Sequence, residues 1–295
     1  MLVGLDSYCF HRYFGEIYGD GLQVDPGTRW DMKDDFVPFA LSLGIDEVAL
    51  EACFFPALDN AYCDALKEDL DEAGMPRILG WGHPDGLHAG TDEAALANLK
   101  AHIPQAQRLG CAIMRIVASS MIHVKDDHAL QVKASVVMLK DAVRVAEDHG
   151  ITLAIENHID FTSTEILDIL DGVGSDNLRV NLDTGNALRL YEDPVEAARN
   201  LAPVTVSTHT KDILPSRGGA PSQNFTWWPS CPAGEGFVDL FGVAAALNEG
   251  GFTGSLALEM DLMAAPWDTL PEEENVTTSI AYLKTIAALY GRKEA

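Results

Sequence analysis

The sequence predicts a single-domain (β/α)8 barrel, or TIM barrel, over residues 1–295. Short apolar runs alternate eight times with longer segments whose apolar residues recur at helical spacing. A chain of 295 residues with 47% hydrophobic composition has the size of such a barrel. The strand segments read as continuous apolar runs, which is typical of parallel strands covered on both faces.

The expected strands follow one another without a linker or low-complexity segment between them. They are 2–6 (LVGLD), 46–52 (DEVALEA), 77–81 (RILGW), 112–118 (AIMRIVA), 152–157 (TLAIEN), 179–183 (RVNLD), 204–209 (VTVSTH) and 255–260 (SLALEM). The alternative is an open doubly wound sheet, which usually carries a glycine-rich phosphate turn after its first strand. Here the first strand leads into DSYCFHRYFGE, which contains neither GxGxxG nor GxxxxGKS/T.

The segments between the strands carry helix signals. The clearest helices are expected at 92–110, 126–150 and 271–291, and longer loops at 7–29 and 210–238. Gly150 closes the second of these helices, as a C-terminal capping glycine does. Pro104 lies inside the first helix and should kink or break it, because proline lacks the backbone N–H.

Composition limits the function classes. No apolar run approaches the length of a membrane span, and the N-terminal MLVGLDSYCF lacks the basic region of a signal peptide. Five cysteines form no CxxC pair, which fits a reduced cytoplasm better than a disulfide framework or a thiolate zinc site. The formal net charge of −25 argues against nucleic acid as a partner. We therefore expect a cytoplasmic protein that binds neither nucleic acid nor membranes.

Four polar residues end four consecutive expected strands. Glu156, Asp183 and His209 are 27 and 26 residues apart, and Glu259 follows 50 residues later, after the long loop. Strand ends of a barrel surround its functional face, so these side chains should meet at one height. A lone residue of this kind is more often a solvated strand tip or a helix cap, but four at equivalent positions indicate a shared site. Carboxylates that meet there repel one another unless a cation neutralises them. Three oxygens and one imidazole suit one divalent ion, with Mn²⁺, Mg²⁺ or Co²⁺ favoured and Zn²⁺ as an alternative.

Other polar residues near strand ends give weaker signals. Glu51, His83 and His158 are candidates for contacts with a substrate or with the metal ligands. Lys211 and Asp212 follow His209 closely, and we expect a local salt bridge or turn for them.

Five motifs, in this order, resemble those of the xylose isomerase-like TIM barrels. They are LAIENH (153–158), NLDTGN (181–186), STHTKD (207–212), PAGEGFVDL (232–240) and LALEMD (256–261). The resemblance covers nearly the whole chain and points to the sugar phosphate isomerase/epimerase group, which includes ketose 3-epimerases, hydroxypyruvate isomerase, inosose dehydratase and endonuclease IV-like enzymes.

The resemblance implies roles for individual residues. Glu156, Asp183, His209 and Glu259 would hold one divalent metal, Mn²⁺ first among the candidates, and the two glutamates would also exchange protons with the substrate. Arg217, in the loop after the histidine strand, would contact that substrate. The chain has Asn186 where many members have a histidine. This departure speaks against a multinuclear zinc site and, with the acidic charge, against a DNA endonuclease; Asn186 is instead a candidate substrate contact.

The predicted activity is therefore that of a metal-dependent isomerase or epimerase. It would act on a keto-sugar or related polyol, unphosphorylated since no phosphate-gripping motif stands out, by proton transfer through an enediolate. A dehydratase or eliminase acting on an inosose or a 3-keto-glycoside is the first alternative. A non-catalytic sugar-binding barrel is the second, although it predicts loss of one glutamate and both are present.

The loop 213–237 is expected to close over the site, with Trp227 or Trp228 lining the sugar pocket. Glycine, proline and serine suit an irregular segment, and its aromatic rings are costly to leave in water. The rival reading has these rings packing on the barrel rim or on a partner subunit of a homo-oligomer.

Overall fold

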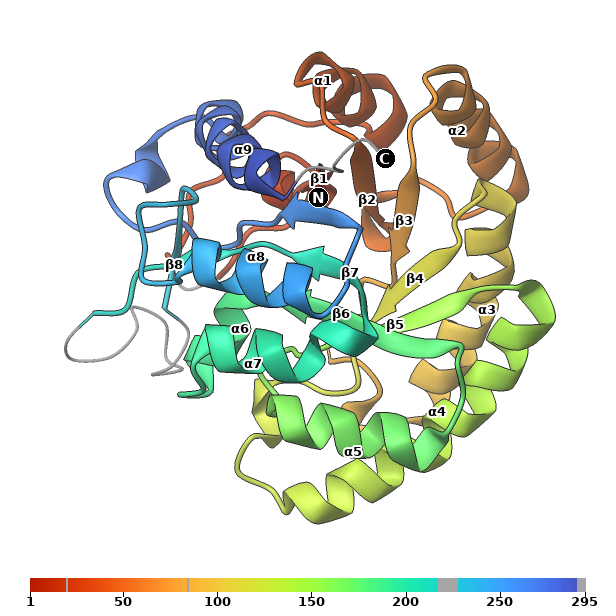
Figure 1. Cartoon of the computed structure of the whole chain (residues 1–295). Helices are drawn as coiled ribbons and strands as arrows, with labels where there is room; N and C mark the ends of the chain where they lie inside the picture. The colour runs from red at the N-terminus through yellow and green to blue at the C-terminus, as the bar shows by residue number, and fades with distance from the viewer. Residues whose placement is uncertain (20, 84, 217–227, 291–295) are drawn as a thin grey trace.

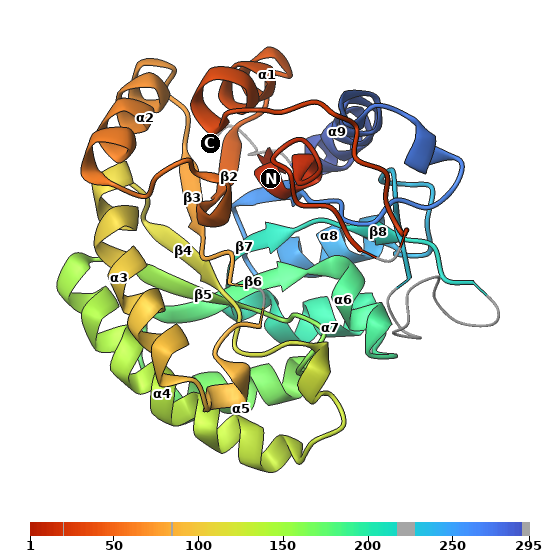
Figure 2. The ribbon, with the colours of Figure 1, turned by 180° about the vertical axis from the view of Figure 1, so that it is seen from behind.

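A closed barrel of parallel strands surrounded by helices forms the protein, as the computed structural model shows in Figures 1 and 2. The structure describes residues 1–19, 21–83, 85–216 and 228–290. Within these ranges the main sheet has eight strands in the order β10-β1-β2-β3-β4-β5-β6-β7. The ring closes where Thr210 pairs in parallel with Leu258, so the alternative of an open sheet is wrong.

The strands lie where the apolar runs predict them, with ends shifted by up to two residues. They are β1 (Leu2–Asp6), β2 (Glu47–Glu51), β3 (Arg77–Gly80), β4 (Ile113–Ile116), β5 (Thr152–Glu156), β6 (Leu178–Asp183), β7 (Thr205–His209) and β10 (Ser255–Leu258). Nearly every strand residue is buried, because side chains on one face fill the barrel and those on the other meet the helices.

The outer ring is built from amphipathic helices. They are α1 (Val37–Ser42), α2 (Asn60–Glu72), α3 (Glu93–Leu109), α4 (His128–His149), α5 (Ser163–Val173), α6 (Thr184–Arg189), α7 (Pro194–Leu201), α8 (Leu240–Glu249) and α9 (Glu272–Leu289). The predicted cap at Gly150 is confirmed, since this glycine ends α4 in the left-handed conformation with φ of 66°. Among the described residues, no helix is long and apolar enough to cross a membrane.

Pro104 does not break the helix, because α3 runs through this proline without interruption, while the kink expected as the other outcome stays a prediction. A proline inside a helix costs about 3 kcal/mol relative to alanine. Ile103 and Ala106 on either side of it are fully buried, and their packing on the barrel offsets that cost.

The long segment between β7 and α8 contains two short antiparallel strands, β8 (Asp212–Ile213) and β9 (Ser230–Cys231), which pair as a small hairpin. The Asp212 carboxylate accepts backbone N–H groups of Gly234, Gly236 and Val238, at 2.9 to 3.0 Å. The turn role expected for Asp212 is thus realised, and it ties the hairpin to the approach of α8. Residues 217–227 of the segment lie outside the described ranges.

Candidate metal and substrate site

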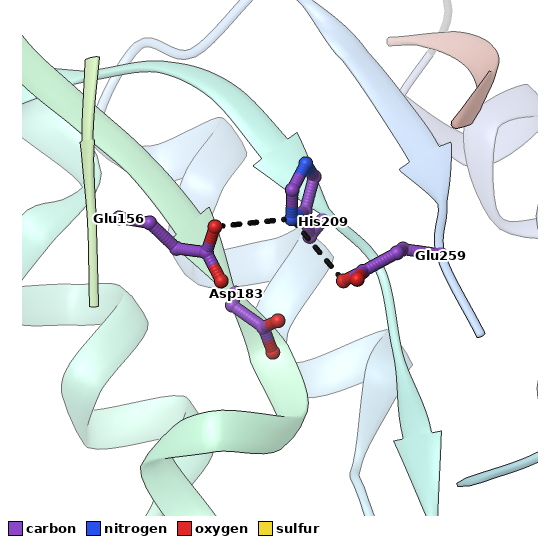
Figure 3. A group of neighbouring side chains, drawn as sticks. All are labelled: Glu156, Asp183, His209 and Glu259. Atoms are coloured by element: carbon purple, nitrogen blue, oxygen red, sulfur yellow. Dashed lines mark ion pairs between the residues drawn. The ribbon is translucent and has the colours of Figure 1, made fainter. Parts of the chain in front are cut away.

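Four side chains meet at the carboxyl ends of the strands, as the spacing predicts. Glu156, Asp183 and His209 are the last residues of β5, β6 and β7, and Glu259 directly follows β10. All four are buried, and one ligand atom from each lies within 4.8 Å of the others (Figure 3). The parallel register pairs Asp183 with His209 on the neighbouring strand, which places the two side chains at one level.

His209 stands at the centre of this group and uses its two ring nitrogens differently. Nδ1 lies 3.4 Å from Oε2 of Glu156 and 3.1 Å from Oε2 of Glu259 (Figure 3). On the opposite side, Nε2 lies 3.2 Å from Oδ2 of Asp6, at the end of β1. Metal-binding histidines commonly direct their second nitrogen to a carboxylate, which fixes the tautomer and leaves the first nitrogen free for the ion.

The residues present fit a divalent cation. Nδ1 of His209, Oδ2 of Asp183 and Oε2 of Glu259 are buried and make no hydrogen bond. Buried polar atoms without hydrogen bonds are costly, and a cation bound among these three would satisfy all of them. A set of three carboxylates and one imidazole suits a hard or borderline divalent ion.

The Asp183 side chain has two functions at once. Its Oδ1 accepts the N–H groups of Gly185 and Asn186 at 2.8 and 2.9 Å, which caps the start of α6. The backbone of Asp183 is held by the Asn157 side chain, whose amide N–H donates to the Asp183 carbonyl at 2.9 Å and whose oxygen accepts the Asp183 N–H at 2.8 Å. The cap fixes the carboxylate so that Oδ2 is left facing the cluster.

Lys211 belongs to the cluster, whereas the sequence suggested only a local salt bridge or turn. Its buried Nζ lies 3.2 Å from Oδ2 of Asp183, 3.0 Å from Oε2 of Glu259 and 3.3 Å from Oδ2 of Asp261. Burial by itself would lower the pKa of Lys211, but these three carboxylates outweigh it and hold the pKa well above its usual value. The cluster therefore contains a fixed ammonium beside its carboxylates.

Arg115 is a second cation that the sequence analysis missed. It lies in β4, is buried, forms an ion pair with Glu51 at the end of β2, and lies 3.5 Å from Oε2 of Glu156. Burial opposes ionisation of Glu156, yet His209 and Arg115 together lower its pKa to about 2. For Glu51, burial prevails over Arg115 and raises the pKa to about 7. An arginine inside the apolar run AIMRIVA was the available signal.

The cluster forms part of the wall of a cavity of about 290 Å³. Glu51, His158 and Lys211 line it together with Glu156 and Glu259. Burial lowers the pKa of His158, so this imidazole is predominantly neutral at physiological pH. Further lining residues come from the loops after β1, β3 and β4; they are Tyr8, Glu16, Tyr18, Asp85, Ser120, Met121 and Ile122.

The other residues predicted to contact the substrate differ in whether they lie at the cluster, away from the cavity or outside the described residues. The Asn186 amide donates a hydrogen bond to Oε1 of Glu156 at 3.1 Å, so it contacts one of the four cluster residues directly. His83 is not among the residues that line the cavity and stacks on Trp81, with ring centroids 5.0 Å apart. Trp228 is also absent from the lining and packs against the hydrophobic core. Arg217 and Trp227 lie outside the described residues, so their predicted roles stay predictions.

Fold and site together define a (β/α)8 barrel whose mouth carries an acid-and-histidine cluster at the strand ends. Residues 37–286 match the xylose isomerase-like TIM barrel family, and the chain belongs to that family. It is 25% identical over 193 residues to the C-glycoside deglycosidase alpha subunit of Microbacterium trichothecenolyticum, which covers 62% of this chain and 47% of that protein. The chain spans less than half the length of the curated relatives that it matches.

Solved structures show the same fold at lower sequence identity. D-psicose 3-epimerase with D-tagatose, from Clostridium cellulolyticum H10, superposes with a TM-score of 0.75 at 16% identity, covering 99% of this chain and 100% of that one. The IolI protein with a binding zinc atom superposes with a TM-score of 0.74 at 16% identity, covering 99% of both chains.

Proposed function

We propose that the protein is a divalent-metal-dependent sugar isomerase or epimerase that acts on a keto-sugar or related polyol. One observation carries the proposal: two buried glutamates from different strands, Glu156 and Glu259, flank the same nitrogen of His209 in the wall of a cavity. Membership in the xylose isomerase-like family and the fold shared with a ketose 3-epimerase support a carbohydrate substrate.

Glu156, Asp183, His209 and Glu259 would hold the ion, with Mn²⁺ favoured for this oxygen-rich set and Mg²⁺, Co²⁺ or Zn²⁺ as alternatives. When bound, such an ion supplies Lewis-acid polarisation of a carbonyl group. Zinc in the related IolI barrel supports a divalent ion in this role.

The glutamates would perform the proton transfers. One carboxylate removes the proton from the carbon next to the carbonyl, and the electron pair of that C–H bond becomes the double bond of an enediolate. For epimerisation the other glutamate returns a proton to the same carbon from the opposite face. For isomerisation the proton is returned on the same face to the former carbonyl carbon, while the neighbouring hydroxyl proton passes to the former carbonyl oxygen. Asn186 and Arg115 hold Glu156 in place through its two oxygens, while Glu51 and His158 are placed to contact sugar hydroxyls.

Elimination is the second candidate, and Lys211 is the observation that favours it. Its ammonium lies 3.0 Å from Oε2 of Glu259, so a proton donor, Lys211, lies beside a proton acceptor, Glu259. If a leaving group is attached β to the carbonyl, a glutamate takes the proton, the bond to the leaving oxygen breaks, and Lys211 protonates that oxygen. The relative named C-glycoside deglycosidase alpha subunit supports a substrate from which a group is released.

Solvent exchange in D₂O tests both candidates. Protein loaded with Mn²⁺ is incubated with keto-sugars, inososes and 3-keto-glycosides, and NMR follows replacement of C–H by C–D next to the carbonyl. Isomerisation or epimerisation gives exchange with a rearranged sugar, whereas elimination gives exchange with a released leaving group. Sugar binding without exchange on any substrate would contradict both and would favour a non-catalytic sugar-binding barrel.

A further inference from the structure

The cavity continues past the metal cluster into a region of different chemistry. Its floor is made by strand-end residues that are charged, such as Glu51, Arg115 and Glu259. The loops that follow the strands contribute Tyr8 and Tyr18, together with the polar residues Glu16, Asp85 and Ser120. The short helical turn η5 (Met121–His123), after β4, contributes Met121 and Ile122.

Tyr8 and Tyr18, which line the cavity, belong to a continuous row of stacked rings, called here the ring wall. Phe14, Phe54, Tyr8, His11 and Tyr18 stack in this order, with neighbouring centroids 4.7, 5.8, 5.1 and 5.0 Å apart. The Tyr8 hydroxyl lies 2.9 Å from Oε1 of Glu16 and 2.7 Å from the Tyr18 hydroxyl. These contacts fix the ring edges, so the wall is formed before any ligand enters.

The second wall is an apolar lip. Ile122 is 59% exposed and still lines the cavity, so its side chain lies at the mouth and not in the core. Met121 beside it is half-buried, and a thioether adapts to ligands of varied shape. A single exposed isoleucine needs no explanation on a surface, but here it lies at the mouth of a cavity whose other loop wall carries aromatic rings.

The charged strand-end residues can hold the hydroxyls of a monosaccharide without contacts from the loop residues. A ligand that also uses the ring wall and the lip needs a polar end and a flat apolar end. We propose that Tyr8, Tyr18, Met121 and Ile122 form an aglycone subsite, so that the substrate is a glycoside whose sugar enters the metal cluster and whose aromatic aglycone lies between the ring wall and Ile122. This inference rests on the proposed function for its sugar end only.

Paired glycosides test the subsite by kinetics. The rate of C–H exchange is measured with methyl and phenyl 3-keto-β-D-glucoside on the Mn²⁺-loaded protein. We expect kcat/KM for the phenyl compound to exceed that for the methyl compound at least tenfold, which corresponds to about 1.4 kcal/mol. Ile122→Ser should reduce this ratio about threefold or more. Leu130→Ser is the matched control, because Leu130 is 62% exposed on α4 and does not line the cavity, and it should keep the wild-type ratio.

Binding measurements separate failure of the subsite from failure of the proposed reaction. Calorimetry with methyl and phenyl β-D-glucoside, which lack the keto group, should show tighter binding of the phenyl compound and loss of that preference in Ile122→Ser. If no substrate exchanges but this preference is present, the proposed function fails and the aglycone subsite stands. Equal kcat/KM values for both keto-glucosides, or equal or absent binding of both glucosides, would overturn the subsite.

Discussion

Glu259 and Asp261 lie two residues apart beyond β10, and both are buried carboxylates near Lys211. Burial opposes ionisation of each, but neighbouring cations lower the pKa of both, that of Asp261 to about 2. Their hydrogen bonding differs. Asp261 accepts hydrogen bonds from Arg189 at 2.9 and 3.2 Å through its two oxygens and from the Ser230 hydroxyl at 2.6 Å. Among the described residues, Oε2 of Glu259 instead has ion-pair contacts alone, 3.0 Å from Nζ of Lys211 and 3.1 Å from Nδ1 of His209.

We interpret the group around Asp261 as structural and the group around Glu259 as the candidate functional group. Around Asp261 the charges are paired within the protein. Arg189 also donates a hydrogen bond to the Trp228 carbonyl at 2.7 Å, so this group ties the hairpin segment to α6. Around Glu259, Nδ1 of His209 and Oδ2 of Asp183 converge without making a hydrogen bond to any described residue, although the Lys211 ammonium lies beside both carboxylates. A divalent ion would complete the coordination of these atoms. Removing a charge should therefore have opposite consequences in the two groups.

The largest expected effect is the loss of proton exchange in Glu156→Gln and Glu259→Gln. Each amide keeps the shape and one potential oxygen ligand but cannot accept a proton, and general acid–base catalysis contributes about 10²–10⁴-fold. Deuterium exchange measured on folded, metal-loaded variants checks this. Glu249→Gln, at an exposed position near the end of α8, is the control that should exchange normally. Near-wild-type exchange in both active-site variants would exclude the two-carboxylate mechanism.

The second prediction contrasts Asp261→Asn with Asp183→Asn in metal-free protein. Asp261→Asn leaves the Arg189 charge buried with a weakened partner, and breaking a buried pair costs about 3 kcal/mol or more. Burial raises the pKa of Asp183 to about 7, so its charge is unfavourable in the metal-free fold. Asparagine also caps a helix well, and Asp183→Asn should leave the free energy of unfolding unchanged or higher. Urea denaturation measures both, and equal losses would show that the two groups do not differ as described.

The fold and the four-residue cluster follow from the sequence because both depend on a repeat. Each βα unit returns the chain to the same end of the barrel, so Glu156, Asp183 and His209 could be aligned by spacing alone. Asp6 ends β1 in the same way and was overlooked, since one aspartate carries no repeat signal. The positions of Lys211 and Arg115 depend on which way a side chain points and on partners 28 to 64 residues away, which spacing does not reveal.

Metal binding gives a third, smaller contrast. A ligand that binds only the folded protein stabilises it by about 2.7 kcal/mol at a concentration 100 times its Kd. Thermal unfolding with and without Mn²⁺, after chelation, should therefore show a higher melting temperature with the ion. His209→Ala removes the imidazole at the centre of the cluster and should abolish this rise. Asp261→Asn should show the same rise, although its melting temperature without the ion is lower than that of the wild type. A rise that persists in His209→Ala would place the ion elsewhere.

The smallest expected effect concerns Trp228, which the sequence analysis offered as a pocket residue. Its ring packs against the core and meets Tyr191 edge-on, with centroids 5.9 Å apart, while its carbonyl accepts the Arg189 hydrogen bond of the structural group. Trp228→Ala should therefore lower the free energy of unfolding by about 2 kcal/mol, less than full burial of a tryptophan would give. KM for the sugar should change little, because the ring does not line the cavity. Trp228→Phe keeps a ring at this position and is expected to restore most of the stability. A raised KM with an unchanged melting temperature in Trp228→Ala would instead place the ring over the sugar, and the division between the structural and the functional group would then have to be redrawn.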